Sequence, residues 1–210
     1  MPSTPTLIAF SIVAAGMVLT PGPNMVYLVS RSISQGRLAG LISLGGVVLG
    51  FVVYMVCAAF GITALVFAVP YAYDALRFAG AAYLLYLAWQ TIRPGGRSPF
   101  QVHALPKDGP HKLFAMGFVT NLLNPKIAMF YLSLLPQFIE PAQGSVLQQS
   151  LLLGLLHISI SVTLNSMIAV TAGTISAFLL TRPAWLLAQR WIMGSMLAGF
   201  AVKMATEAKR

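Results

Sequence analysis

Two apolar stretches of the chain are each interrupted by proline and asparagine, at Thr20-Pro21-Gly22-Pro23-Asn24 and at Asn121-Leu122-Leu123-Asn124-Pro125-Lys126. Proline lacks a backbone N–H and clashes with the carbonyl four residues earlier, so each stretch is expected to end one helix and begin another. Within a bilayer, an interrupted backbone is tolerated only where it is buried in protein or lines a polar cavity. Two such breaks, in corresponding places of two chain halves, predict a binding site between the halves.

The composition predicts an integral membrane protein. The chain is 58% hydrophobic and 8% charged, whereas soluble domains carry roughly 25% charged residues. Uncharged runs cover residues 1–30, 38–73 and 141–181, and each exceeds the roughly 20 residues that cross a bilayer. The net charge is +9, but the basic residues fall in short loops and at helix ends. We therefore expect them to set the orientation in the membrane, and we expect no nucleic-acid binding.

Hydropathy and length predict one all-α transmembrane domain over residues 1–210, with about six transmembrane helices. The expected helices are residues 6–30, 37–60, 72–92, 113–138, 146–171 and 184–206. Helices one and four are the pair that the prolines break. The first half is 1–92, a polar loop follows at 93–112, and the second half is 113–210. If each half crosses three times, the halves form two inverted three-helix repeats.

Lysine and arginine are concentrated after the first, third and fifth expected helices, at Arg31, Arg37, Arg93, Arg97, Lys107, Lys112, Arg182 and Arg190. This bias predicts odd-numbered loops in the cytoplasm and both termini outside, although the basic tail at Lys203, Lys209 and Arg210 argues against it. The second helix also carries the small-residue pairs Gly36/Gly40 and Gly46/Gly50. Such pairs allow either close packing inside the chain or a homodimer.

The first break, at Pro21, Gly22 and Pro23, predicts backbone groups without helical partners. The prolines free the carbonyls of Met17 and Leu19, by i to i−4 counting. Asn24 is then expected to act as the N-cap of a half-helix that runs to Ser30. Freed carbonyls can accept hydrogen bonds from an ammonium group, which makes this break a candidate half of a binding site.

The second break predicts the complementary half of the site. Asn124 is expected to be an N-cap and Pro125 the first helical residue of a half-helix over 126–135. Its N-terminal N–H groups, with the charge of Lys126, would attract a carboxylate. A site with both halves suits a zwitterion, namely an amino acid. The candidate binding residues are Pro21, Gly22, Pro23, Asn24, Asn121, Asn124, Pro125 and Lys126.

Other interpretations of these residues stay open. The two breaks could be kinks that only shape the bundle, and Lys126 could have a structural partner. His157 lies in an uncharged run, where it could relay protons or simply pack with hydrogen-bonded neighbours. An intramembrane enzyme that uses His157 with Ser161 lacks a carboxylate in this run to orient the histidine. A scaffold without transport would leave the breaks unexplained. We therefore expect no catalytic residues, no cofactor and no metal site.

Three segments carry a resemblance to the LysE/RhtB amino-acid exporters. The first is Thr20-Pro21-Gly22-Pro23-Asn24 with Ser30-Arg31-Ser32-Ile33-Ser34-Gln35-Gly36-Arg37 and Ala39-Gly40. The second is Gly117-Phe118, Thr120-Asn121-Leu122-Leu123-Asn124-Pro125-Lys126 and Leu135-Pro136-Gln137-Phe138. The third is Ala82-Tyr83-Leu84-Leu85-Tyr86-Leu87. The resemblance spans nearly the whole chain.

The resemblance implies an exporter of amino acids in the bacterial inner membrane, driven by an ion gradient, for which we expect the proton, rather than by ATP. The family covers basic and neutral amino acids and related metabolites. The chain's only acids are Asp74, Asp108, Glu140 and Glu207, all near expected helix ends or loops. A cationic side chain would need a buried carboxylate, so we expect a neutral, threonine-, homoserine- or leucine-like substrate. Basic amino acids, another small metabolite or a metal ion are the alternatives.

Overall fold

The computed structural model describes residues 2–68, 72–93 and 107–206, which form helices and, over these ranges, no β-strand. The long helices are α1 (Thr4–Leu19), α2 (Pro23–Gln35), α3 (Arg37–Ala68), α4 (Ala72–Ile92), α5 (Pro110–Leu122), α7 (Val146–Leu180) and α8 (Pro183–Thr206). Between α5 and α7 lie the shorter α6 (Pro125–Met129), η1 (Phe130–Leu134), η2 (Leu135–Phe138) and η3 (Pro141–Gln143). Most of the expected loop 93–112 lies outside the described residues.

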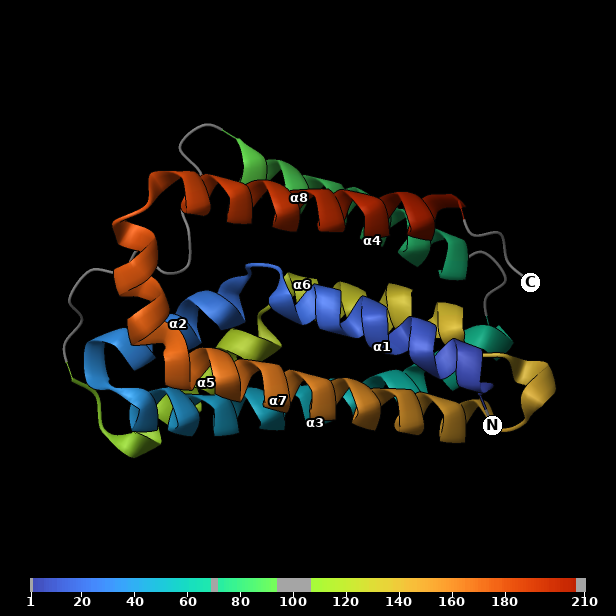
Figure 1. The fold of residues 1–210 in the computed structure, drawn as a ribbon. Coiled ribbons are helices and arrows are strands. Elements are labelled where there is room, and N and C mark those ends of the chain that lie inside the picture. Colours follow the sequence, from blue (N-terminus) through green and yellow to red (C-terminus); the bar gives the residue numbers. More distant parts are fainter. Residues whose placement is uncertain (1, 69–71, 94–106, 207–210) are drawn as a thin grey trace.

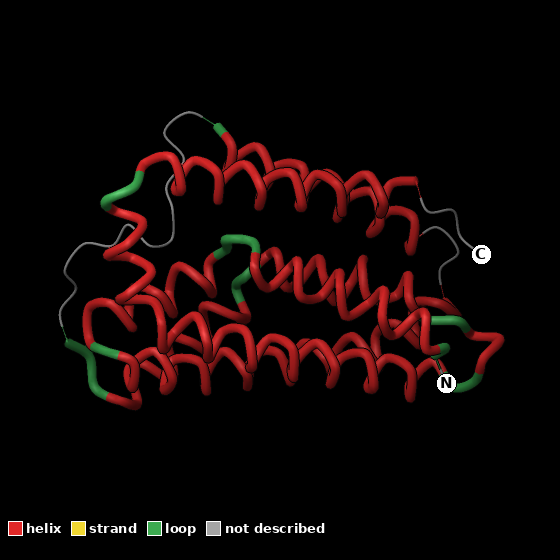
Figure 2. The backbone as a smooth tube through the Cα atoms, viewed as in Figure 1, coloured by secondary structure: helices red, strands yellow, loops and turns green. Residues whose placement is uncertain are grey.

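Two pairs of helices are bent at short non-helical segments. α1 and α2 meet at an angle of 55° across residues 20–22, and α5 meets the segment 125–138 at 49° across residues 123–124. Pro23 and Pro125 each open the second helix of their pair, where a missing N–H costs no helical hydrogen bond. Figure 2 shows these loop segments inside the bundle, among the helices, rather than at its ends.

Two unbroken helices are long and apolar enough to cross a membrane, by length and composition. They contain the stretches 37–61 of α3 and 146–175 of α7, and each bent pair passes the same test as one span. In α8 a shorter apolar stretch covers 190–202. The described residues therefore provide two candidate spans, or up to four when each bent pair is counted as one, which is fewer than the six that hydropathy predicts.

The helices pack in layers (Figure 1). α4 and α8 lie side by side, while α1, α3, α5 and α7 lie together with the two breaks between them. The contact of α1 with α7 is matched by the contact of α5 with α3. The two bent pairs therefore use equivalent neighbours in the two halves of the chain.

Small residues allow α3 and α5 to approach each other closely. A Cβ atom added at Gly46 would overlap the backbone carbonyl of Phe114, and one added at Gly117 would overlap that of Ser43. One added at Gly50 would lie 2.6 Å from Oδ1 of Asn121. The Gly46/Gly50 pair is therefore used inside the chain, and this pair supplies no surface for the homodimer that the sequence allowed.

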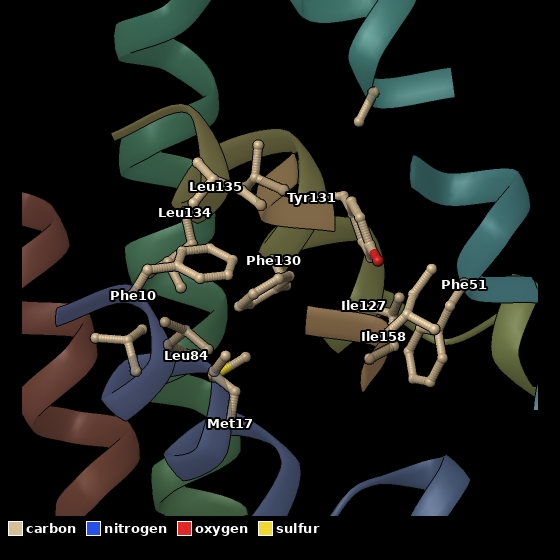
Figure 3. Packing of buried hydrophobic residues seen from close by; sticks show 14 of the residues in the cluster. Phe10, Met17, Phe51, Leu84, Ile127, Phe130, Tyr131, Leu134, Leu135 and Ile158 are labelled. Carbon is tan, nitrogen blue, oxygen red and sulfur yellow. The ribbon is translucent and has the colours of Figure 1, made fainter. Parts of the chain in front are cut away.

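The centre of the bundle is an apolar cluster to which α1, α3, α7 and the segment after the second break all contribute (Figure 3). The Phe10 ring of α1 lies 5.9 Å from the Phe130 ring and 5.2 Å from the Phe138 ring. Outside the bundle, large apolar side chains are exposed on several helices, for example Ile12, Phe60, Trp89 and Met167. Exposed apolar surface of this extent is typical of a protein that faces lipid.

Candidate functional site

The carbonyls at the end of α1 are occupied by a side chain from the other half of the chain. The Nζ atom of Lys126 donates hydrogen bonds to the carbonyl oxygens of Met17, at 2.9 Å, and Thr20, at 2.7 Å. Lys126 is 4% exposed. The C-terminus of a helix carries partial negative charge, which favours a cation there. Of the two carbonyls that were expected to receive a substrate's ammonium, those of Met17 and Leu19, the Met17 carbonyl receives the ammonium of Lys126 in this conformation, and the second acceptor is Thr20 and not Leu19.

Gly22 makes room for this contact. A Cβ atom at position 22 would lie 3.0 Å from both Cε and Nζ of Lys126. At the other break, the hydroxyl of Tyr54 on α3 donates to the carbonyl of Leu122 at 2.7 Å. Each interrupted helix thus ends against a polar side chain from the opposite half, and Lys126 couples the two breaks to each other.

Asn24 is not the N-cap of α2. The N-cap is Gly22 and Pro23 is the first helical residue, so Asn24 falls one position inside the helix. Its side chain makes no capping hydrogen bond. The Asn24 amide is buried, and neither its oxygen nor its nitrogen has a hydrogen-bond partner among the described residues. A buried amide without partners is rare and calls for an explanation, such as a bound water molecule or ligand.

The second break has the predicted N-cap, and the helix that follows it changes its winding along its length. Asn124 is the N-cap, its Oδ1 accepts the Lys126 backbone N–H at 3.0 Å, and Pro125 is the first helical residue, as predicted. The predicted half-helix 126–135 is confirmed as part of a helical segment from Pro125 to Phe138. Its winding changes along the way, because regular α-helix ends at Met129 and π- and 3₁₀-helical turns follow. Pro136, which cannot donate a hydrogen bond, lies in the last of these segments. α2 is regular α-helix over all of its 13 residues, so the N-terminus at the first break carries partial positive charge as well.

A small cavity lies at the first break. It is lined by the polar residues Asn24, Lys126, His157, Ser161 and Asn165 and by the apolar residues Met17, Val18, Met25, Phe51, Ile127 and Phe130. Its free volume is about 20 Å³, which is room for about one water molecule and not for an amino acid. Accepting a larger ligand therefore requires the surrounding helices to separate.

His157 joins the cavity to the core through two hydroxyl groups. Its Nε2 lies 3.2 Å from Oγ of Ser161, and its Nδ1 lies 2.9 Å from the hydroxyl of Tyr131. The imidazole also packs against the Phe130 ring, with 4.2 Å between centroids. His157 is therefore hydrogen-bonded on both nitrogens, and either hydroxyl can donate or accept.

Ser161 and Asn165 were not among the residues predicted to bind a ligand. Together with His157 they form a polar stripe on α7 at positions i, i+4 and i+8, which lies on one helical face. Asn165 Nδ2 donates to the backbone carbonyl of Ser161 at 2.9 Å. The four-residue spacing of these polar residues was the sequence signal for this face.

The structure brings only some of the predicted site residues to the cavity. Asn24 and Lys126 line it, Gly22 contacts the Lys126 side chain, and Asn124 orients the Lys126 backbone. Asn121 is fully buried between α5 and α3, and it is absent from the cavity wall. The prolines Pro21, Pro23 and Pro125 shape the backbone and do not line the cavity.

A second polar cluster joins α2 to the start of α5. Asp108 accepts from Arg31 at 2.7 Å and from Lys112 at 2.6 Å. The hydrogen bond from Lys112, together with Arg31, holds the pKa of the Asp108 carboxyl below its ordinary value. Nearby, the Tyr27 hydroxyl donates to the carbonyl of Leu113 at 2.8 Å. Arg31, which the sequence marks as a charge that sets orientation, thus also ties α2 to the residues just before α5.

Nearly the whole chain matches a known family. The profile of the family described as LysE type translocator covers residues 15–208. The chain belongs to the LysE type translocator family. This membership places the chain among membrane translocators. No solved structure matches the chain.

Similar curated proteins agree with this family. The chain is 28% identical over 197 residues to an uncharacterized membrane protein of Pseudomonas aeruginosa. It is 27% identical over 190 residues to a leucine efflux protein of Enterobacter sp. strain 638, and 26% identical over 194 residues to a leucine efflux protein of Salmonella typhimurium. Each alignment covers 90% of both chains.

Proposed function

We propose that this LysE type translocator is a secondary-active exporter of neutral amino acids with an apolar side chain, acting across the bacterial inner membrane. The observation that carries the proposal is the Asn24 amide, which is buried at the cavity with no hydrogen-bond partner among the described residues, on the same wall as Lys126. Leucine efflux proteins that resemble the chain along 90% of its length support this substrate class.

The substrate's carboxylate would bind at the start of α2. Asn24 and Met25 lie in the first turn of this helix, so their backbone N–H groups have no acceptor within the helix. The Asn24 side-chain nitrogen adds a donor, and Lys126 has one N–H left after its two carbonyl contacts. Helix N-termini with an adjacent cation are favourable sites for carboxylates.

The substrate's side chain would lie against the apolar part of the wall. Met17, Phe51, Ile127 and Phe130 offer a surface that suits a branched aliphatic group. No carboxylate is among the residues that line the cavity as described, so a lysine or arginine side chain would be left without a counter-charge. This favours neutral over basic amino acids.

Transport would proceed by alternating access of two inverted three-helix halves with six membrane crossings. Each half contains a bent pair, one long apolar helix and a further helix, and the α1–α7 contact has its equivalent in α5–α3. Reciprocal contacts of this kind are expected when two halves are related by a pseudo-two-fold axis in the membrane plane. The odd-numbered loops would be cytoplasmic and both termini outside.

Proton coupling would use His157. The Ser161–His157–Tyr131 chain of hydrogen-bonding groups begins at the cavity and continues into the core. Imidazole can accept a proton on one nitrogen and release one from the other, which suits a relay. Replacing His157 with Gln would then abolish uphill export driven by a proton gradient while leaving exchange of substrate for substrate measurable.

A metal ion is the rival cargo. Within residues 2–68, 72–93 and 107–206, no group of three or more His, Cys, Asp or Glu residues is placed to hold a metal ion. Hard and borderline cations prefer clusters of such ligands. The position of Lys126 at the cavity also disfavours a cation there.

Counterflow of labelled compounds in proteoliposomes that contain only this protein tests the proposal. The panel is leucine, threonine, homoserine, lysine and a divalent metal ion, each compared with protein-free liposomes. We expect exchange of leucine, with weaker exchange of the smaller, more polar threonine and homoserine. Exchange of lysine alone, or of the metal ion alone, would contradict the assignment.

A further inference from the structure

We infer that the site selects its substrates by their carboxylate and does not require an α-ammonium, so that it also carries 2-hydroxy acids with apolar side chains. This inference rests on the proposed function and specifies the chemistry of the same site. It comes from the distribution of charge around the cavity and from the hydrogen bonds that Lys126 already makes.

The groups best suited to an ammonium are already used. The carbonyls of Met17 and Thr20 each accept a hydrogen bond from Nζ of Lys126, and the Met17 carbonyl also accepts one from the Thr20 hydroxyl at 2.7 Å. A substrate ammonium could use them only by displacing Lys126. Displacement would leave the Lys126 charge to find another partner inside the protein, which is costly.

The charges at the cavity favour an anion. Lys126 is a cation, the start of α2 carries partial positive charge, and no acidic residue lines the cavity. A bound monocarboxylate compensates the charge of Lys126. A bound zwitterion brings a second cation with its carboxylate, and so leaves one positive charge without a counter-ion in a site of low dielectric constant.

The remaining polar groups suit a hydroxyl as well as an ammonium. The side-chain oxygens of Asn24, Ser161 and Asn165 are neutral and belong to residues that line the cavity. A neutral acceptor is a sufficient hydrogen-bond partner for a hydroxyl, because a hydroxyl needs no counter-charge when it leaves water. Replacing the α-ammonium of leucine by a hydroxyl therefore removes the free-energy cost of burying a second cation and keeps the hydrogen bond to a neutral acceptor.

A matched pair of leucine analogues separates the two recognition modes. 2-Hydroxy-4-methylpentanoate keeps the carboxylate and lacks the ammonium, whereas leucinamide keeps the ammonium and lacks the carboxylate. In proteoliposomes we expect the hydroxy acid to compete with labelled leucine at a concentration within about threefold of leucine itself. Leucinamide should be at least roughly tenfold weaker, which corresponds to the loss of about one charge-assisted hydrogen bond.

A second measurement is direct exchange of the labelled hydroxy acid, corrected for its passive entry into protein-free liposomes. It distinguishes failure of this inference from failure of the proposed function. Exchange of leucine without exchange or competition of the hydroxy acid overturns this inference and leaves the proposed function standing. Exchange of the hydroxy acid without leucine overturns the proposed function and supports the inference. Absence of both contradicts both.

A single substitution neutralises the charge of the site. Asn24→Asp preserves the shape of the side chain and adds a negative charge next to Lys126. We expect this variant to lose competition by the hydroxy acid and to gain competition by leucinamide relative to the wild type. An unchanged ranking of the two analogues in a folded, membrane-inserted variant would contradict carboxylate selection at the start of α2.

Discussion

Asn24 is the residue at which folding and function conflict most clearly. Its amide is buried and lacks partners among the residues described, and a buried polar group in that condition costs about 1–3 kcal/mol. Replacing Asn24 with Ala should therefore leave the apparent Tm in detergent unchanged or raise it. The same change should raise the KM for leucine counterflow about tenfold or more, since a hydrogen bond to a carboxylate is lost.

Asn121 provides a matched control. It is also a buried asparagine whose amide has no partner in the described part of the chain, but it lies between α5 and α3 and not at the cavity. Asn121→Ala should leave the KM within about twofold of the wild type. If both variants impair leucine exchange equally, the binding role assigned to Asn24 is wrong.

At this scale, the sequence predicts what depends on neighbours along the chain. The Asn124–Pro125 cap is confirmed because both residues act within one turn. The cap at Asn24 failed because Pro23 already fills the first helical position, which moves the cap back to Gly22. The partners of Lys126 lie more than 100 residues away in sequence, and only the fold brings them together.

At the scale of elements, the contact between α3 and α5 depends on the absence of side chains. A Cβ atom at Gly46 would overlap the carbonyl of Phe114. Gly46→Ala should therefore lower stability by about 1–3 kcal/mol or more, as expected for overpacking against backbone. The measurement is the apparent Tm and the yield of monodisperse protein in detergent.

Gly173→Ala on α7 is the control for this substitution. A Cβ atom there meets nothing within 4 Å, and alanine has the higher helix propensity. We expect unchanged or slightly higher stability. A Gly46→Ala variant as stable as Gly173→Ala would contradict the close packing of α3 on α5.

The ion pairs between α2 and the start of α5 should make stability depend on pH. The pKa of Asp108 is held below its ordinary value of 3.8 by Lys112 and Arg31. A carboxyl with a lowered pKa in the folded state contributes stability above its unfolded-state pKa and loses that contribution as pH falls through the folded value. Asp108→Asn should therefore lower the apparent Tm near neutral pH, and this deficit should vanish well below pH 3.8.

This prediction concerns a difference between two proteins measured in the same detergent. Only the gap between wild type and Asp108→Asn is informative, because other carboxyls titrate in both. A gap that stays constant from neutral pH to well below 3.8 would show that Asp108 contributes through its shape and not through its charge.

Hydropathy predicts the positions of the long apolar helices but not the detail of the segments between them. Uncharged runs located α3 and α7 closely, because nothing interrupts their apolar sequence. The π- and 3₁₀-helical segments from Phe130 to Phe138 were not predictable. In this segment Phe130 and Phe138 pack around Phe10 of α1, a contact between distant parts of the sequence that no local pattern encodes.

At the scale of the whole molecule, the proposed orientation places the two ends of the bundle on opposite sides of the membrane. The chain has one cysteine, Cys57, so a Cys57→Ala background permits single reporters. Two exposed positions suit such reporters: Lys107→Cys, just before α5, and Gln143→Cys, in η3. Figure 1 shows the start of α5 and the segment after η2 at opposite ends.

A membrane-impermeant thiol reagent then reports the topology in whole cells. We expect modification of Gln143→Cys from outside, and modification of Lys107→Cys only after the membrane is opened. The reverse pattern would invert the orientation, as the basic residues at the C-terminus would favour. Labelling of both from outside would contradict the proposed crossings.

The membrane class was predictable from composition, and the first of the two breaks is where the structure has the cavity that we propose as the binding site. The structure adds that Lys126 lies across the first break and joins the two halves. The site that we propose is therefore the anion-favouring start of α2 and no longer a pair of breaks that binds both ends of a zwitterion. Such a contact belongs to the assembled molecule and to neither half alone.

Counterflow of labelled leucine, compared between the wild type and Lys126→Met in matched proteoliposomes, tests the central claim most directly. Methionine keeps much of the apolar length of the side chain but cannot donate to Met17, Thr20 or a carboxylate. We expect exchange by the wild type and, at equal inserted protein, less than about a tenth of that rate in the variant. Equal rates in the two proteins would contradict a site built around Lys126.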